Sequence, residues 1–225
     1  EISACLVGSE MCIRDRSTPA PTLGRRERNK QQKLERITAA ATELFAQHGI
    51  DDVTTQQIAE KADVGTGTLF LYAKTKGELL LLVQNAHYAV ALETGRAAAE
   101  ATPDTLDAAM ALLRPIIECN RAQIENGRTY LREMVFGNPT DSHHAEALRI
   151  VGDTENALAD ILRRDPTIDD NRAAALARIV SAVMFVTMAA SVNAEASIDE
   201  IAQDVRAQVD ALPVSYTHLR AHETG

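Results

Sequence analysis

Thr66, Gly67 and Thr68 form the stretch of this chain whose residue types are best suited to binding an anion. Two threonine hydroxyls can donate hydrogen bonds, and glycine has no side chain that would keep a ligand away from the backbone. If a helix begins here, its first N–H groups also point toward the ligand and favour negative charge. The stretch therefore indicates contact with phosphate oxygens.

The residues around this stretch predict two short helices joined by a tight turn. Thr54 followed three residues later by Gln57 is a capping-box pattern, so the first helix is expected to begin directly after Thr54. The apolar residues of this helix share one face: Ile58, Ala59 and Ala62. The turn ends at Gly65, which tolerates backbone angles that other residues resist, and the second helix runs from Thr66 to about Tyr72. Such a pair is typical of a helix-turn-helix, although a small hairpin inside an all-α core has the same pattern.

Two further helices frame this pair. An apolar stripe at spacings of three and four predicts a helix of roughly fifteen residues, which ends at Gly49 in a C-cap position. The stripe consists of Leu34, Ile37, Ala40, Ala41, Leu44 and Phe45. After the pair, Thr75 and Glu78 form a second capping box, which opens another helix at Lys76. Residues 31–78 are therefore expected to form a three-helix unit from which a fourth helix leaves.

The spacing of these residues resembles the DNA-binding domain of the TetR family of bacterial transcriptional regulators. The matching positions are Arg36-Ile37, Ala40-Ala41, Leu44-Phe45, Gly49, Thr54, Ile58-Ala59, Ala62, Val64, Gly67-Thr68-Leu69-Phe70, Tyr72, Lys76 and Leu79. Gly65 departs from the family pattern where a Ser or Thr often caps the recognition helix, and Ala73 departs where an aromatic residue often follows. The resemblance implies that residues 25–78 form a DNA-binding domain, with the helix-turn-helix motif at residues 54–73.

The resemblance also implies which side chains contact DNA. Six residues match DNA-contacting positions of the family: Thr66, Gly67, Thr68, Phe70, Leu71 and Tyr72. The two threonines are expected to reach base edges or phosphates, and Leu71 is expected to touch a thymine methyl group. Further phosphate contacts are expected at the starts of the second and fourth helices, from Thr55, Gln56 and Lys76.

A basic run precedes the first helix, and it consists of Arg25, Arg26, Arg28, Lys30 and Lys33. Such a run by itself is equally a solvated surface. Before a DNA-binding domain it is interpreted as an arm whose arginines (Arg25, Arg26 and Arg28) hold the DNA backbone. Residues 25–76 carry nine Lys/Arg against seven Asp/Glu, whereas the whole chain has a net charge of −9. The acidic remainder repels DNA, so one local docking face is expected rather than general coating of nucleic acid.

The composition places the chain in the all-α class. Its 225 residues include 4 % aromatic residues and seven prolines, and no stretch alternates like a strand. Residues 1–24 are expected to be a disordered lead-in, and the first sixteen resemble translated adapter sequence rather than a signal peptide. Residues 214–225 are expected to be a tail of the same non-native kind.

Residues 79–213 are expected to form a larger helical domain. Helical spacing recurs through several segments, and Pro115 inside one of them predicts a kink. Asn126-Gly127 is expected to end that helix. The TetR resemblance implies a ligand pocket in this domain. Its candidate residues, each also explained as ordinary core, are Tyr88, Met110, Cys119, Tyr130, Met134 and Phe136. Their largely apolar character favours a hydrophobic small-molecule effector.

The last two helices of the sequence are expected to mediate assembly. Residues 171–193 are unusually apolar but short and interrupted, which favours a core or interface helix over a membrane span. Ser197 and Glu200 form a third capping box, which opens the final helix. The resemblance implies that both helices pair with a second copy, and the candidate interface residues are Ile179, Val183, Ile201, Val205 and Val209. The alternative is that the apolar face of the final helix packs only within the chain.

Patterns for catalysis and metal binding are weak in this sequence. Cys119 is the only cysteine between residues 25 and 213, so neither a disulfide framework nor a thiolate zinc site is expected there. His143 and His144 are placed in a solvent-exposed polar loop. No catalytic residue, metal ligand or cofactor is assigned, and enzymatic activity is not expected.

The sequence therefore predicts a cytoplasmic, dimeric, sequence-specific DNA-binding transcriptional regulator. The resemblance implies a repressor that a small-molecule ligand releases from a palindromic double-stranded DNA operator. A transcriptional activator is the alternative within this class. A helical enzyme or interaction module that contains a helix-turn-helix is the alternative outside it.

Overall fold

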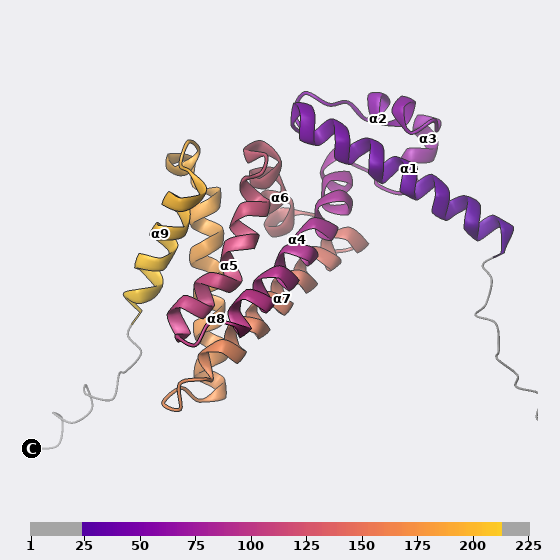
Figure 1. Ribbon diagram of the computed structural model, residues 1–225. Coiled ribbons are helices and arrows are strands. Elements are labelled where there is room, and N and C mark those ends of the chain that lie inside the picture. The colour runs from indigo at the N-terminus through magenta and orange to yellow at the C-terminus, as the bar shows by residue number, and fades with distance from the viewer. Residues whose placement is uncertain (1–23, 213–225) are drawn as a thin grey trace, which may run out of the picture.

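The computed structural model describes residues 24–212, which form α-helices and one short 3-10 helix, without a strand in this part of the chain. The elements are α1 (Arg25–His48), α2 (Thr55–Lys61), α3 (Thr66–Leu69), α4 (Lys76–Glu100), α5 (Thr105–Arg121), α6 (Ile124–Phe136), α7 (Ser142–Leu162), α8 (Asp170–Ala189), η1 (Ser191–Asn193) and α9 (Ile198–Asp210). The first three helices gather at one end of the molecule, and α4 leads from them into a larger bundle (Figure 1). The expected all-α fold is confirmed. The expectations for the two terminal segments fall on residues outside the described range.

The three N-terminal helices pack around a small apolar core. Ile37 and Phe45 of α1, Ile58 of α2 and Leu69 of α3 are each at most 1 % exposed. α1 is longer than its apolar stripe predicted, because the basic run from residue 25 to 33 continues the helix instead of forming a separate arm. Arginine, lysine and glutamine all favour helix, so this extension forms without apolar residues of its own.

The turn between α2 and α3 differs from the sequence expectation. Asp63 takes the left-handed backbone conformation, with a φ of 51°, whereas Gly65 has a φ of −69°. Aspartate tolerates this conformation better than most residues. Arg36 of α1 contacts it twice, because its Nη1 donates to the Asp63 carboxylate at 3.0 Å and to the Asp63 carbonyl at 3.3 Å. The turn therefore depends on a long-range contact rather than on the conformational freedom of glycine.

The predicted helix starts are largely confirmed. Reciprocal capping boxes open α2 at Thr54 and α9 at Ser197. The side chain of Thr75 caps α4 by accepting a hydrogen bond from the Glu78 N–H. The Glu78 carboxylate does not accept the Thr75 N–H, as a full capping box requires, because it accepts the Lys74 N–H at 2.6 Å instead. The end of α3 was misplaced: the helix stops at Leu69, and the backbone continues to Tyr72 as turns.

α4 lies along α5 and α7 in the larger domain (Figure 1). Its close approach to α5 depends on Gly95, because a Cβ atom there would lie 2.2 Å from the Leu112 carbonyl oxygen. α5 itself continues through Pro115 and ends at Arg121. The interior of the domain is therefore set by backbone-to-backbone contacts as well as by apolar side chains.

The expectation that Asn126-Gly127 ends a helix is wrong. Both residues lie in the first turns of α6, and the break comes earlier, at Ala122 and Gln123. Gln123 caps α6 by accepting the Asn126 N–H through its side chain. Glycine is required at residue 127 for a different reason, since a Cβ atom there would lie 2.0 Å from the Asn120 carbonyl oxygen. The Asn-Gly pair thus marks a close crossing of α5 and α6, not a helix end.

α9 uses its apolar stripe within the subunit. Ile201 and Val205 are 1 % and 0 % exposed, and α9 packs against α5 and α8. Side chains without free surface cannot gain contacts with a second copy, so their assignment to a dimer interface is corrected. Val183 and Val209 are half-buried against the same core, and Ile179 on α8 remains exposed.

By length and composition, α8 is the one helix within residues 24–212 that is apolar enough to cross a membrane. In this structure it contacts α7, α9 and α6 inside the helical bundle. Core helices of such bundles pass the same test, which fits the interpretation of this segment as a core or interface helix.

A buried asparagine joins the N-terminal helices to the larger domain. Asn126 of α6 is 2 % exposed, and its Nδ2 donates to the Phe45 carbonyl at 2.8 Å. Its Oδ1 accepts the Ile50 N–H at 2.7 Å, just after the left-handed Gly49 (φ 74°). The amide thus satisfies backbone groups that the end of α1 leaves unpaired.

Asn126→Ala is expected to lower the free energy of unfolding by about 2 kcal/mol, because the buried Ile50 N–H loses its acceptor. Urea denaturation followed by circular dichroism measures the change. The control is Asn29→Ala, at an exposed position of α1, which is expected to change stability by less than about 0.5 kcal/mol. Equal losses in the two variants would contradict the role assigned to Asn126.

Candidate nucleic-acid interface

The end of the helix-turn-helix presents hydroxyls and large apolar side chains together. Leu71 is 83 % exposed and Phe70 is 42 % exposed. Thr66 and Gly67 are also exposed, and Thr68 is half-buried. We call residues 66–72 the recognition segment. Because Leu71 contributes little to the core, its side chain is available for contact with a partner.

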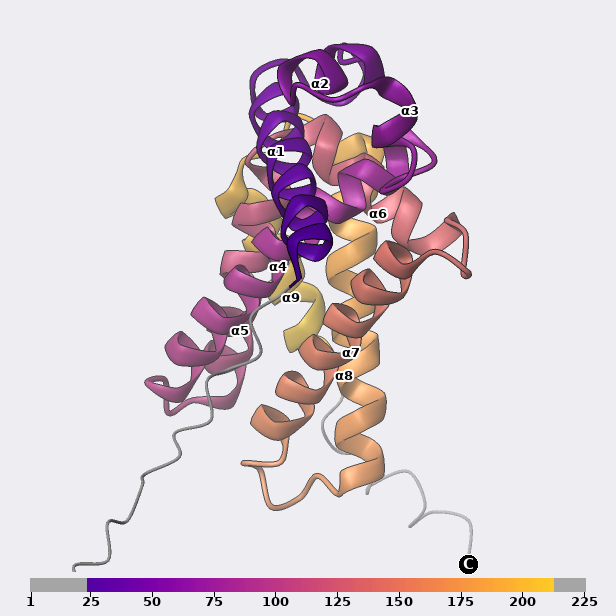
Figure 2. The same ribbon diagram turned by 90° about the vertical axis from the view of Figure 1, so that its right-hand side faces the viewer.

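Contacts with α1 hold the recognition segment in place. The Tyr72 hydroxyl donates to the Lys30 carbonyl at 3.1 Å, beyond the point where α3 ends. The Lys61 ammonium at the end of α2 lies 2.9 Å from the Glu43 carboxylate, and its hydrogen bond and charge lower the pKa of that carboxyl. α2 and α3 lie next to α1 at the end of the molecule (Figure 2). The segment is therefore positioned by side chains of another helix.

The remaining predicted contact residues surround this segment in different environments. Thr55 is half-buried at the start of α2, and Gln56 is exposed, with its amide donating to Glu60 at 2.9 Å. The Lys76 ammonium donates to the Asp51 carbonyl at 3.2 Å and keeps further N–H groups for a phosphate. The arginines of the expected arm, all exposed, occupy the first turn of α1: Arg25, Arg26 and Arg28.

This surface suits nucleic acid better than it suits catalysis. Threonine hydroxyls pair with base edges or phosphates, and an exposed leucine packs on a thymine methyl group. No group of three or more His, Cys, Asp or Glu residues is arranged for a metal ion within residues 24–212. The recognition segment offers hydroxyls and an apolar side chain for base edges. Lysine and arginine side chains at its margins can contact phosphates.

Comparison with known protein families also favours nucleic-acid binding by this surface. Residues 37–83 match the family described as "Bacterial regulatory proteins, tetR family", from the core of α1 through the recognition segment into α4. The match to this family covers the N-terminal helices and the start of α4. No curated protein sequence matches it.

Solved structures share the fold of this chain. Thermus thermophilus FadR, a TetR-family transcriptional repressor in complex with lauroyl-CoA, has a TM-score of 0.62 at 22 % identity, over 79 % of this chain and 91 % of FadR. Bacillus subtilis FadR, in complex with stearoyl-CoA, has a TM-score of 0.57 at 16 % identity, over 79 % and 97 %. RolR, in complex with resorcinol, has a TM-score of 0.60 at 20 % identity, over 81 % and 87 %. The coverage shows that the likeness extends through the larger domain.

Three of the predicted pocket residues line one internal cavity of the larger domain. Tyr88, Tyr130 and Met134 enclose a space of about 20 Å³ together with residues of α5, α7 and α8. The two tyrosine rings stack, with centroids 4.2 Å apart and an interplanar angle of 19°. Burial raises the pKa of both tyrosine hydroxyls, and it raises the pKa of the neighbouring Cys119 thiol to about 11. These groups are therefore neutral at pH 7.

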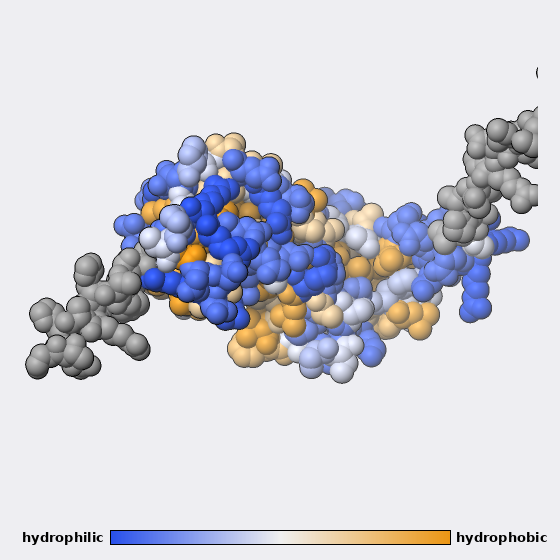
Figure 3. Space-filling model, turned by 90° about the horizontal axis from the view of Figure 1, so that it is seen from below, coloured by the Kyte–Doolittle hydropathy of each residue, from blue (hydrophilic) through white to orange (hydrophobic). Residues whose placement is uncertain are grey.

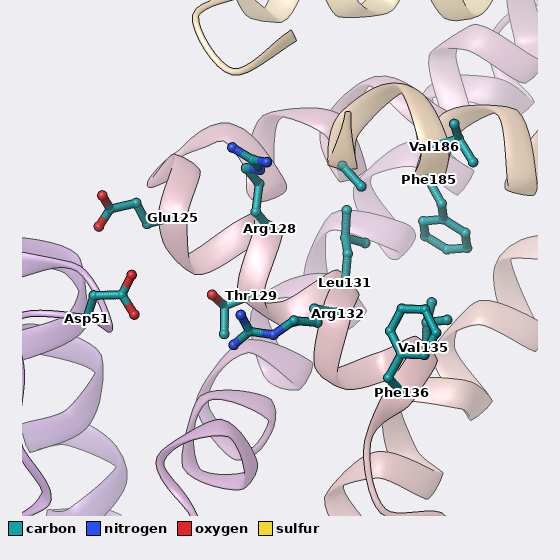
Figure 4. A pocket seen from close by; sticks show the side chains of 11 residues that line it. Asp51, Glu125, Arg128, Thr129, Leu131, Arg132, Val135, Phe136, Phe185 and Val186 are labelled. Atoms are coloured by element: carbon teal, nitrogen blue, oxygen red, sulfur yellow. The ribbon is translucent and has the colours of Figure 1, made fainter. Parts of the chain in front are cut away.

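The other predicted pocket residues lie elsewhere. Met110 is half-buried against the core. Phe136 is 82 % exposed and lines a surface groove of about 530 Å³ between α6 and α8. Figure 4 shows Phe136 near Phe185, with Arg128 and Arg132 at the polar part of the same groove. Phe136 therefore lies apart from the cavity beside Tyr88, and its assignment to a ligand pocket stays a prediction.

The sequence analysis missed several polar residues of the larger domain that lie at contacts between helices. His143 was expected in an exposed loop, but it lies in α7 and its Nε2 bonds the Tyr72 carbonyl at 3.0 Å. His144 is 5 % exposed, and its Nε2 bonds the Met134 carbonyl at 2.9 Å. The buried Asn85 of α4 was also missed. In the sequence, each of these is a polar residue within an apolar stripe. Such a pattern does not identify the hydrogen-bond partner of the residue.

The Cys119 thiol is expected to react slowly in the folded protein. At pH 8 a thiol with a pKa of about 11 has roughly 100-fold less thiolate than one with an ordinary pKa, and thiolate is the reactive form. The reaction of a chromogenic disulfide with a Cys5→Ser, Cys12→Ser variant measures this single thiol.

The expected rate at pH 8 is about 100-fold lower in buffer than in urea, and it rises about tenfold per pH unit up to pH 10, because the thiolate fraction grows below the raised pKa. A rate in buffer equal to that in urea would show that Cys119 is neither buried nor held as the thiol.

Proposed function

We propose that the chain is a dimeric, sequence-specific DNA-binding repressor that a small-molecule ligand releases from a palindromic operator in the cytoplasm. The recognition segment carries this proposal, because it exposes Leu71 beside threonine hydroxyls while contacts with α1 fix its position. The protein needs no catalytic group for this role, since binding and release of DNA are equilibria.

DNA reading is assigned to the recognition segment and its margins. Thr66 and Thr68 contact base edges or phosphates, and Leu71 contacts a thymine methyl group in the major groove. Lys76 and the arginines of the first α1 turn contact the phosphate backbone. Few long polar side chains extend from the segment, so the sequence-dependent shape of DNA also contributes to specificity.

A small-molecule effector is proposed to bind in the larger domain. Structural neighbours have been solved with lauroyl-CoA, stearoyl-CoA and resorcinol, which supports a ligand with an apolar part for this chain. The cavity beside Tyr88 and Tyr130 has a volume of about 20 Å³, enough for about one water molecule. An effector therefore requires the surrounding side chains or helices to move apart, which creates a second conformation.

The effector and DNA are then coupled through these two conformations. A ligand releases DNA only if it binds the DNA-incompetent conformation more tightly, and DNA must weaken ligand binding by the same factor. In the incompetent conformation the two recognition segments of a dimer no longer match half-sites about one DNA turn apart.

The dimer surface is assigned to an exposed apolar stripe on α8. The stripe has spacings of three and four and consists of Ile179, Ala182, Val186 and Ala189. Ile179 is 44 % exposed and Val186 is 69 % exposed, although the helix is otherwise packed in the bundle. A twofold axis places the stripes of two copies against each other, which removes both from water. The end of the bundle opposite α2 and α3 is mainly hydrophilic, with separate apolar patches (Figure 3).

Leu71→Ala is expected to reduce affinity for the operator by about tenfold and affinity for scrambled DNA by less than about twofold, because a lost thymine contact affects sequence reading alone. Fluorescence anisotropy with the upstream DNA of the gene, at several salt concentrations, measures both affinities. Leu148→Ala, at an exposed leucine of α7, is the control and is expected to bind like the parent. Lack of any sequence preference in the parent protein would refute the proposed function.

Val186→Asp is expected to convert the dimer into a monomer, because each α8 stripe would then bury an unpaired carboxylate. Sedimentation velocity at micromolar concentration measures the mass. Val90→Asp, at a valine of α4 with a matching exposure of 66 %, is expected to leave the dimer intact. A dimer in both variants would place the interface on another surface.

A further inference from the structure

A line of hydrogen bonds runs from the internal cavity to the recognition segment. The Tyr130 hydroxyl, at the cavity wall, donates to the Asn85 Oδ1 at 2.9 Å. The Asn85 Nδ2 donates to the His143 carbonyl at 2.9 Å. The His143 Nε2 bonds the Tyr72 carbonyl at 3.0 Å, where the recognition segment ends. Residues of α6, α4 and α7 thus lie in one connected series.

Each member of this series has a defined orientation. Tyr130 is 2 % exposed and Asn85 is 6 % exposed, so neither exchanges its partner for bulk water without cost. The Asn85 side chain accepts from Tyr130 through its Oδ1 and donates to His143 through its Nδ2. These two bonds fix the orientation of the amide. A carbonyl can only accept, so the His143 Nε2 must carry a proton when it bonds Tyr72.

The series ends where the recognition segment is attached to α1. The Tyr72 carbonyl accepts a hydrogen bond from the His143 Nε2, and the Tyr72 hydroxyl donates to the Lys30 carbonyl at 3.1 Å. Its neighbour Leu71 is 83 % exposed. Because α3 has only four residues, a change at Tyr72 is transmitted directly to the residues proposed to read DNA.

We propose that Tyr130, Asn85 and His143 are positioning residues that couple the state of the cavity to the placement of the recognition segment. A ligand that enters the cavity must displace the Tyr130 ring, which withdraws its hydroxyl from Asn85. Asn85 then loses its fixed orientation, and the contact of His143 with Tyr72 weakens. The inference rests on the proposed function only in assigning the effector to this cavity.

The stacked partner ring supplies a matched control. Tyr88 is as deeply buried as Tyr130 and also lines the cavity, but its hydroxyl accepts a hydrogen bond from Asn120 of α5 at 2.8 Å. Tyr88→Phe and Tyr130→Phe therefore remove the same atom from the same ring pair. Only the Tyr130 hydroxyl belongs to the series that reaches Tyr72.

Amide hydrogen exchange of the full-length protein, measured by mass spectrometry without DNA or ligand, tests the coupling. Exchange of residues 66–76 is compared with that of residues 112–117 in α5, so that any loss of global stability is separated from a local change. Tyr130→Phe is expected to raise exchange of residues 66–76 about three- to tenfold, whereas Tyr88→Phe is expected to change it less than twofold. Equal changes in the two variants, or none in Tyr130→Phe, would overturn the proposal.

Substitutions at His143 test the next step of the series. His143→Ala is expected to raise exchange of residues 66–76 as Tyr130→Phe does. His143→Gln, which keeps a donor at the position of the Nε2, is expected to restore protection. The Tyr130→Phe, His143→Ala double variant is expected to exchange no faster than His143→Ala alone. If the increases in exchange of the two single variants multiply in the double variant, the two contacts are independent. That result would contradict a connected series.

DNA binding separates this inference from the proposed function. If operator preference holds in the parent and Tyr130→Phe weakens it several-fold more than Tyr88→Phe does, both ideas are supported. If the parent shows no sequence preference but the exchange results hold, the coupling stands and the proposed function fails. If the parent prefers its operator but the two tyrosine variants weaken binding equally, the proposed function stands and the coupling fails.

Discussion

A helix of four residues cannot keep its shape by itself, and this constraint governs the whole DNA-reading end of the molecule. Helix formation begins with a costly nucleus, so isolated helices shorter than about 12 residues are marginal in water. α3 spans only Thr66–Leu69. Its placement therefore comes from Leu69 in the core and from the contacts of Asp63 and Tyr72 with α1. Whatever displaces α1 or these contacts also displaces the recognition segment.

A buried amide connects this end to the larger domain, and a second one joins helices within that domain. Asn126 satisfies two backbone groups at the end of α1, and Asn85 joins α6 to α7 through its side chain. A buried hydrogen bond is directional, and losing one partner costs about 1–3 kcal/mol. Such contacts depend on the distance and the angle between donor and acceptor, so they hold the groups that they join in a defined orientation.

The cavity beside the stacked tyrosines of the larger domain is small in this structure. The stacked Tyr88 and Tyr130 form part of the cavity wall, and the cavity beside them measures about 20 Å³. Side chains in such an interior cannot yield by small amounts without loss of packing, because protein cores are close to crystal density. Opening the cavity therefore selects a different packing of the bundle. The fold is common to this chain and its structural neighbours, whereas the side chains that line the cavity belong to this sequence.

The sequence by itself determined most helix starts and their capping, because these depend on residues within about four positions of each other. The capping boxes at Thr54 and Ser197 are examples. Only the tertiary structure decided that Asn126 and His143 join the two domains, since their partners lie 76 and 71 residues away along the chain. It also decided that Val205 faces the subunit's own core. A helical period shows which residues share a face, but the packing of the other helices sets whether that face meets the same chain or a second copy.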